Sequence, residues 1–328
     1  MMSHRLWFSS AGAAAIGAAG ACAALSACLS VAPEHARAPS DAGRAASHER
    51  DERAGDARRA DEPAPRFTDA DFERHVEQLK RRLPHDGFTI IIEKPFVVIG
   101  DESPAMVKRR AEGTVRWAVD HLTRRYFRND PLHILDVWLF KDRQSYEKHH
   151  RELFGGDPGT PFGFYSARHR ALVMNIATGG GTLVHEIVHP FIEANFPDCP
   201  PWFNEGLGSL YEQCDEQNGV IRGLTNWRLA GLKRSIERGD LPTFEALCAM
   251  KAHSFYSSGG DNYAQARYLL YYLQERGLLL DFYQRFTAGV KNDPTGYASL
   301  RAVLGEDGDD MAAFQKRWAE WVMKLTFP

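Results

Sequence analysis

Two histidines and a glutamate stand close together near the middle of the chain, in the His-Glu-Ile-Val-His segment at residues 185–189. On an α-helix, residues four apart lie on one face about one turn from each other, so the imidazoles of His185 and His189 can share a metal ion. Zinc suits this pair of nitrogen ligands, and Glu186 is placed to accept a proton from a metal-activated water. The segment therefore predicts a zinc site on a helix, with a pair of packed, hydrogen-bonded histidines as the alternative.

A catalytic zinc ion needs a third protein ligand, commonly a glutamate from a second helix. Eleven residues after His189 the chain reads Pro-Pro-Trp-Phe-Asn-Glu-Gly-Leu, at residues 200–207, which places Glu205 sixteen residues after His189. The paired prolines favour the end of an extended segment and the start of a helix, which places Glu205 in the first turns of that helix. The intervening residues 195–200 are rich in turn formers and can return the second helix beside the first.

Together, the two segments resemble the gluzincin metallopeptidases, the superfamily that contains thermolysin and aminopeptidase N. The Trp-Phe-Asn-Glu-Gly stretch at residues 202–206 is similar to the aminopeptidase N-like form of the segment that carries the third ligand. The resemblance implies that His185, His189 and Glu205 bind Zn²⁺. It also implies that Glu186 is the general base in the hydrolysis of peptide bonds.

The same resemblance points to three further residues. Aminopeptidase N-like enzymes carry, at a similar interval, a helical tyrosine whose hydroxyl stabilises the tetrahedral intermediate, and Tyr263 is the candidate here. Packing on a tyrosine-rich helix is the alternative role for Tyr263. Thermolysin-like relatives place an aspartate four residues after the ligand glutamate to orient a histidine, and this chain has Ser209 there. Ser209 and Asn204 are therefore the candidates for orienting the ligands, unless the orienting group comes from elsewhere.

The elements that must position these residues differ before and after the histidine pair. Before it, the sequence pattern predicts helices and strands, and after residue 182 strand signals nearly vanish. We therefore predict an α+β, zincin-like fold, with a mixed α/β lobe containing a β-sheet over residues 67–180, a mainly helical lobe over 181–328, and the active site between them. The predicted helices cover 72–83, 105–127, 144–153, 227–238, 263–276, 278–286 and 311–323, and the predicted strands cover 89–99, 133–140, 162–166 and 171–176.

The start of the chain has the pattern of a secretory signal, in which Arg5 precedes an Ala- and Gly-rich apolar stretch that is too weakly apolar for a permanent membrane span. The stretch ends in Leu-Ser-Ala-Cys at residues 25–28, which resembles the bacterial lipobox. We therefore expect a lipoprotein signal peptide over 1–27 and a membrane anchor through lipid on Cys28. A plain signal peptide with an incidental cysteine is the alternative. Because Leu29 rather than aspartate follows, the resemblance favours the outer membrane of the cell envelope.

The overall composition excludes several other classes of protein. The 328 residues carry 40 basic and 43 acidic side chains, a net charge of −3, which argues against a nucleic-acid partner. Hydrophobic residues make up 44% of the chain, enough for a core, but residues 28–66 hold almost no large apolar side chain and are predicted to be a flexible tether. Cys199 and Cys214 could form a disulfide across the ligand helix, although another pairing with Cys248, or three thiols, is equally defensible.

The expected substrate is a peptide or protein, but the sequence leaves the cleavage mode open. Aminopeptidases bind the substrate's free amine through an acidic segment on a strand before the metal helix. Here residues 171–176 read Ala-Leu-Val-Met-Asn-Ile, with no acid to pair with an ammonium group. The predicted strand could still bind an extended peptide by edge pairing. Two alternatives to a peptidase are a zinc-bearing envelope protein that binds a partner without hydrolysis and a hydrolase of non-protein amides.

Overall fold

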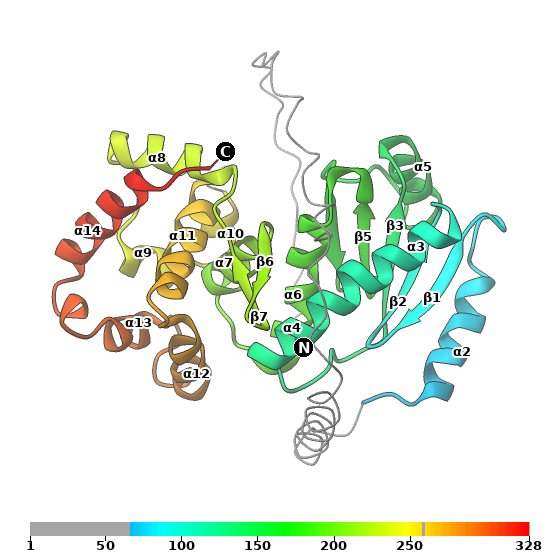
Figure 1. The fold of residues 1–328 in the computed structure, drawn as a ribbon, viewed down its shortest axis with the longest axis horizontal. Coiled ribbons are helices and arrows are strands. Elements are labelled where there is room, and N and C mark those ends of the chain that lie inside the picture. The colour runs from blue at the N-terminus through cyan, green and yellow to red at the C-terminus, as the bar shows by residue number, and fades with distance from the viewer. Residues whose placement is uncertain (1–65, 258–259, 328) are drawn as a thin grey trace, which may run out of the picture. The chain divides into compact units, whose positions relative to one another are not determined.

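The computed structural model describes residues 66–257 and 260–327. The predicted signal peptide, Cys28 and the predicted tether up to residue 65 lie outside these residues. Residues 66–328 form one compact unit. As predicted, this unit is mixed α and β, with a five-stranded sheet in its N-terminal part and mostly helices in its C-terminal part (Figure 1). No helix within the described residues combines the length and the apolar character needed to cross a bilayer.

The sheet has the strand order β1-β2-β3-β5-β4, in which the three central strands run parallel and both edge strands pair antiparallel with their neighbours. The strand predicted over 171–176 is β5, which lies between β3 and β4. The prediction that it could receive a peptide by edge pairing is wrong, because both of its sides are already paired. The strands are β1 (Thr89–Glu93), β2 (Phe96–Gly100), β3 (Leu135–Phe140), β4 (Gly163–Ser166) and β5 (Ala171–Asn175).

Both faces of this sheet are covered, because the apolar side chains of its central strands alternate between two cores. In β2, Val98 belongs to the larger core, which continues into the C-terminal helices, and Val97 belongs to a smaller core on the opposite face. The smaller core includes residues of α2 (Asp69–Lys80) and α5 (Arg143–Leu153). Full burial of all five β2 residues follows from this two-sided packing.

The larger core holds the helix that carries the histidine pair. α6 (Gly181–Asn195) contacts β4, β5 and α4 (Trp117–Arg125). The helix predicted over 105–127 corresponds to α3 (Pro104–Arg110), a π-helical turn and α4, one after another. These elements and α6 contribute residues to the same core, so α6 is held against the sheet by apolar packing.

The C-terminal part is built around α7, which packs between α6 and α11. α7 is the helix predicted to follow the paired prolines, and the four helices predicted from periodicity correspond to α8, α11, α12 and α14, whereas α9, α10 and α13 were not predicted. The helices are α7 (Pro201–Leu210), α8 (Arg228–Arg238), α9 (Phe244–Ala249), α10 (Ala252–Tyr256), α11 (Asp261–Glu275), α12 (Leu279–Gly289), α13 (Tyr297–Leu304) and α14 (Met311–Lys324).

A two-stranded hairpin, β6 (Cys214–Gln217) and β7 (Val220–Gly223), follows α7 and was not predicted. Its strands are short and β6 is polar, so they lack the apolar alternation that marks a half-buried strand. The turn does carry a signal, because Asn218 and Gly219 both have positive φ and Asn-Gly is a favoured pair in two-residue hairpin turns. No disulfide joins Cys199 to Cys214 in this part of the described chain.

Candidate metal centre

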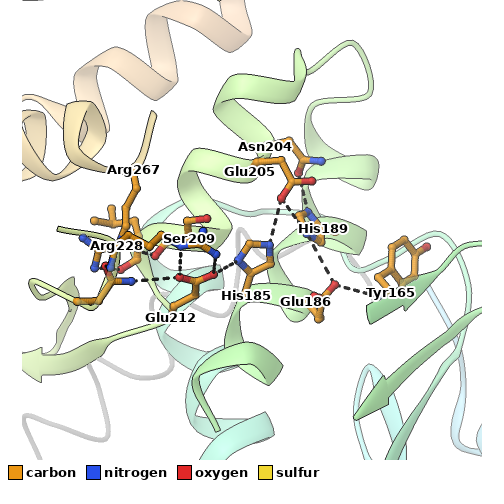
Figure 2. A network of polar contacts seen from close by, with 12 residues as sticks. Tyr165, His185, Glu186, His189, Asn204, Glu205, Ser209, Glu212, Arg228 and Arg267 are labelled. Carbon is orange, nitrogen blue, oxygen red and sulfur yellow. Dashed lines mark hydrogen bonds and ion pairs between the residues drawn. The ribbon is translucent and has the colours of Figure 1, made fainter. Parts of the chain in front are cut away.

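Two neighbouring helices bring the predicted metal ligands together. α6 carries His185, Glu186 and His189, and α7, which begins at a proline as expected, carries Glu205 in its second turn (Figure 2). α7 approaches the histidine pair closely because Gly208 has no side chain. A Cβ atom at this position would lie 3.0 Å from the His185 ring, which is tighter than most real contacts.

The spacing of the donor atoms fits a tetrahedral metal ion. His185, Glu186 and His189 each place one donor atom within 4.8 Å of the others, in a group that could hold a metal ion. Oε2 of Glu205 lies 3.2 Å from Nε2 of His185 and 3.9 Å from Nε2 of His189. Two ligands at about 2.1 Å from a tetrahedral zinc ion are about 3.4 Å apart. The two measured separations lie on either side of this value, so Glu205 is positioned to complete the group.

Glu186 points from α6 toward the edge strand of the sheet. The backbone N–H of Tyr165 in β4 donates a hydrogen bond of 2.9 Å to Oε2 of Glu186, and this same oxygen lies 3.8 Å from Nε2 of His189 (Figure 2). Burial raises the pKa of Glu186, and the imidazoles of His185 and His189 oppose that rise. A carboxylate with a raised pKa beside a metal group is suited to accept and return a proton.

Each histidine has a polar partner on the ring nitrogen that faces away from the metal group. Nδ1 of His189 donates a hydrogen bond of 3.0 Å to Oδ1 of Asn204, which leaves Nε2 of that ring as the metal-facing donor atom. Nδ1 of His185 lies 3.2 Å from Oε1 of Glu212, in an ion-pair contact that is not well aligned for a hydrogen bond. The sequence singled out Asn204 but not Glu212.

Ser209, the other residue proposed to orient a ligand, has a different role in the structure. Its hydroxyl is buried and makes no hydrogen bond to any described residue. Its backbone carbonyl accepts a hydrogen bond of 2.8 Å from Nε of Arg267. The carboxylate that faces Nδ1 of His185 is instead that of Glu212, which stands beyond the end of α7. The indication of Glu212 in the sequence was weak. A glutamate seven residues after Glu205 lies on the same helix face as Glu205 only if the helix continues that far, and α7 ends at Leu210.

Glu212 is held by a dense set of donors. Arg228 contacts both of its carboxylate oxygens, with Nε at 2.8 Å and Nη2 at 2.6 Å, and Nδ2 of Asn226 donates at 3.1 Å (Figure 2). Burial by itself would raise the pKa of Glu212, but the hydrogen bonds from Arg228 and the contact with the His185 imidazole outweigh burial and lower this pKa to about 2. Glu212 is therefore an anion at neutral pH.

A second arginine, the fully buried Arg267 of α11, caps the C-terminal end of α7. It donates to the backbone carbonyls of Ser209, at 2.8 Å, and Leu210, at 3.4 Å, and also to that of Leu224. The last carbonyls of a helix have no hydrogen-bond partner within the helix and carry partial negative charge. A guanidinium group there supplies the missing hydrogen bonds and also neutralises this charge. Burial lowers the pKa of Arg267 to about 10, which keeps it charged at neutral pH.

Two tyrosines lie on the other side of Glu205. The hydroxyl of Tyr256 donates a hydrogen bond of 2.8 Å to Oε1 of Glu205, so Oε2 is the oxygen that faces the histidines. The ring of Tyr263 lies 6.1 Å from that of Tyr256, and its hydroxyl makes no hydrogen bond within the described residues. Burial raises the pKa of both hydroxyls, so both stay protonated donors. The sequence singled out Tyr263, whereas nothing in the pattern around Tyr256 marked it.

The charges of the centre leave room for a cation. The centre holds three carboxyl groups (Glu186, Glu205 and Glu212), and of these, within the described residues, only Glu212 pairs with a guanidinium group, that of Arg228. Buried charges are costly unless they are paired or bind a metal. Burial by itself would lower the pKa of His185, but its contacts with Glu205 and Glu212 raise it to about 10, so the surroundings favour positive charge at this point. The donor set therefore fits a divalent metal ion in both geometry and charge.

In comparisons with protein-family models and with curated protein sequences, the chain matches no family model and no curated sequence.

Proposed function

We propose that the protein is a zinc-dependent hydrolase of peptide bonds with a gluzincin-like centre. The observation that carries this proposal is the convergence of Oε2 of Glu205 with the Nε2 atoms of His185 and His189, at 3.2 Å and 3.9 Å, from two separate helices. Both nitrogen ligands and one oxygen ligand are of the kinds that zinc prefers. When bound there, zinc supplies a water molecule of lowered pKa and polarises the carbonyl that is attacked.

The residues around the metal group each have a separate role in the proposed hydrolysis. Glu186, whose pKa is raised by burial, takes the proton of the attacking water and passes it to the departing amine. Tyr263 donates its hydroxyl proton in a hydrogen bond to the oxyanion, and its raised pKa keeps that proton in place. Asn204 and Glu212 hold the two imidazoles in the orientation that ligation needs. A purely binding site would have no use for the partly buried Glu186, which favours hydrolysis over partner binding.

The edge strand β4 supports a peptide as the substrate. β4 pairs with β5 on one side only, and the N–H of Tyr165 already bonds to the general base Glu186. An extended peptide that lies along the other side of β4 would thus pass beside the metal group. We also propose, from the sequence alone, that lipid on Cys28 anchors the protein to the outer membrane of the cell envelope.

The experiment that tests this function combines metal analysis with a peptide-library digest, using the purified mature protein. We expect about one zinc ion per chain and cleavage that a chelator abolishes. The Glu186→Gln variant should keep the zinc and lose nearly all hydrolysis. Glu193→Gln is the matched control, because Glu193 lies on the same helix and its side chain, within the described residues, has one polar partner, the hydroxyl of Tyr165 at 3.1 Å, so this variant should stay active. Full activity in Glu186→Gln, or no chelator-sensitive cleavage, would overturn the proposal.

A further inference from the structure

We infer that Arg228 is a positioning residue that links two parts of the centre, the metal ligand His185 and the oxyanion donor Tyr263. This inference rests on the proposed function for the roles of those two residues. Arg228 belongs to α8, and its contacts within the described residues include none of His185, His189 and Glu205. It acts through Glu212 on one side and through an aromatic ring on the other.

The first contact of Arg228 is with Glu212. The guanidinium group reaches both carboxylate oxygens, at 2.8 Å and 2.6 Å, which fixes the plane of the carboxylate as well as its position. The solvent-exposed fraction of the side chain is 21% for Arg228 and 6% for Glu212, so solvent screens the attraction between these two charges weakly. Oε1 of Glu212, the oxygen at 2.6 Å from Nη2, is also the one that lies 3.2 Å from Nδ1 of His185. Arg228 therefore fixes the atom that faces the imidazole.

The second contact of Arg228 is with Tyr263. The guanidinium carbon lies 5.3 Å from the centre of the Tyr263 ring, within the range of a cation–π interaction. Tyr263 stands in the first turn of α11, next to the end of α10, and its ring also packs against Phe255 at 5.1 Å. A ring held between Phe255 and Arg228 has little freedom to turn. Arg228 thus restricts the direction in which the Tyr263 hydroxyl can point.

The backbone that carries Arg228 is itself held in place. Its N–H donates to Oδ1 of Asn226 at 3.1 Å, and Nδ2 of the same asparagine bonds to Glu212. Asn226 is fully buried, and its backbone N–H and carbonyl both bond to the hydroxyl of Tyr268, at 3.0 Å and 3.2 Å. Because Asn226 holds the backbone of Arg228 in place, the Arg228 side chain can position both Glu212 and Tyr263 with the precision that catalysis requires.

The test measures zinc affinity by competition with a chelator, and kcat and KM on a cleaved peptide, for the full chain and its variants. Arg228→Met should weaken zinc binding by about 10- to 100-fold. It should also lower kcat at saturating zinc by about 10- to 100-fold while changing KM little, because the oxyanion donor is misplaced. Arg228→Lys keeps the charge but not the planar two-point contact, so a smaller loss of both is expected. It also serves as the test variant if Arg228→Met does not fold.

The matched control is Arg222→Met, because Arg222 lies on β7 of the nearby hairpin, pairs with Glu275 of α11 and, within the described residues, contacts none of the centre. This variant should keep zinc affinity and kcat. Combining Arg228→Met with Glu212→Gln should weaken zinc binding no more than Glu212→Gln alone, since Arg228 acts on the metal through that carboxylate. Combining it with Tyr263→Phe should likewise lower kcat no further than Tyr263→Phe alone.

Each outcome separates this inference from the proposed function. Wild-type zinc affinity in folded Arg228 variants would overturn the inference while leaving the hydrolase proposal intact. Additive losses in either double variant would overturn the corresponding link. If the wild type binds zinc but cleaves no peptide, the hydrolase proposal and the link to Tyr263 fail, and the zinc affinities still decide the link to His185. A wild type that binds no zinc would overturn both proposals.

Discussion

Nδ1 of His185 lies 3.2 Å from Oε1 of Glu212, so a carboxylate faces the side of the imidazole opposite to Glu205 (Figure 2). α7 ends at Leu210, and Glu212 reaches the ring from the segment just beyond it. Each ring nitrogen of His185 therefore faces a carboxylate, Nε2 that of Glu205 and Nδ1 that of Glu212. Glu212, rather than Ser209, is thus the candidate residue to orient His185.

Replacing Ser209 by alanine should leave zinc binding unchanged. The buried Ser209 hydroxyl makes no hydrogen bond within the described residues. Its removal should therefore either lower the free energy of unfolding by less than about 1 kcal/mol or raise it. Asn204→Ala, in contrast, should weaken zinc affinity by about tenfold or more, because the partner of His189 Nδ1 is lost. Chelator competition on both variants compares the two positions. A tenfold loss in Ser209→Ala would show that its hydroxyl does orient a ligand.

The two tyrosines near Glu205 should give different defects when each is changed to phenylalanine. Tyr256→Phe removes the hydrogen bond to Oε1 of Glu205, so zinc affinity should fall and the protein should lose about 1 kcal/mol of stability. Tyr263→Phe should leave zinc affinity unchanged and lower kcat by about 10²- to 10³-fold. Zinc titration and steady-state kinetics of both variants measure these effects. Normal kcat in Tyr263→Phe would remove it from the oxyanion role, and Tyr256 would be the next candidate.

Adding a methyl group at Gly208 should displace a metal ligand. The new Cβ would lie 3.0 Å from Nε2 of His185, so the ring must shift and zinc affinity should fall by about tenfold or more. Gly231→Ala is the control, because the nearest atom to a Cβ at that helical glycine is Nη2 of Arg234, at an ordinary contact distance of 3.9 Å. It should bind zinc normally and gain up to about 1 kcal/mol of stability from helix propensity. Equal zinc affinity in the two variants would contradict the close approach of α7 to His185.

Removing the metal should lower the melting temperature without unfolding the protein. The ligand helices α6 and α7 share a continuous apolar core with the sheet and the C-terminal helices, so packing alone should hold them in the zinc-free protein. Zinc at about 100 times its Kd should add about 3 kcal/mol to the free energy of unfolding. Thermal melts with zinc and with chelator measure this gain, and Glu205→Ala should lose most of it. Loss of helical circular dichroism on chelation alone would show instead that the metal is needed for folding.

Local patterns in the sequence were sufficient for the elements that carry the ligands. The spacing of His185 and His189 defines one face of a helix, and the paired prolines before Trp202 mark the start of the next helix. Both signals act over a few residues, because helix periodicity and the fixed φ of proline are properties of the local backbone. The α+β arrangement was predictable for the same reason. The interior position of β5 was not, since strand order depends on pairing between distant segments.

The sequence by itself determined which residue types could bind a metal and supply a base: His185, Glu186, His189 and Glu205. Only the tertiary structure decided which residues support them. Glu212, Arg228 and Tyr256 come from separate elements, and no fixed spacing along the chain relates them to the ligands they hold. Their roles arise from burial, because a buried charge or hydroxyl without a partner is costly in free energy. Polar groups that packing brings into contact therefore pair with one another, wherever they lie along the chain.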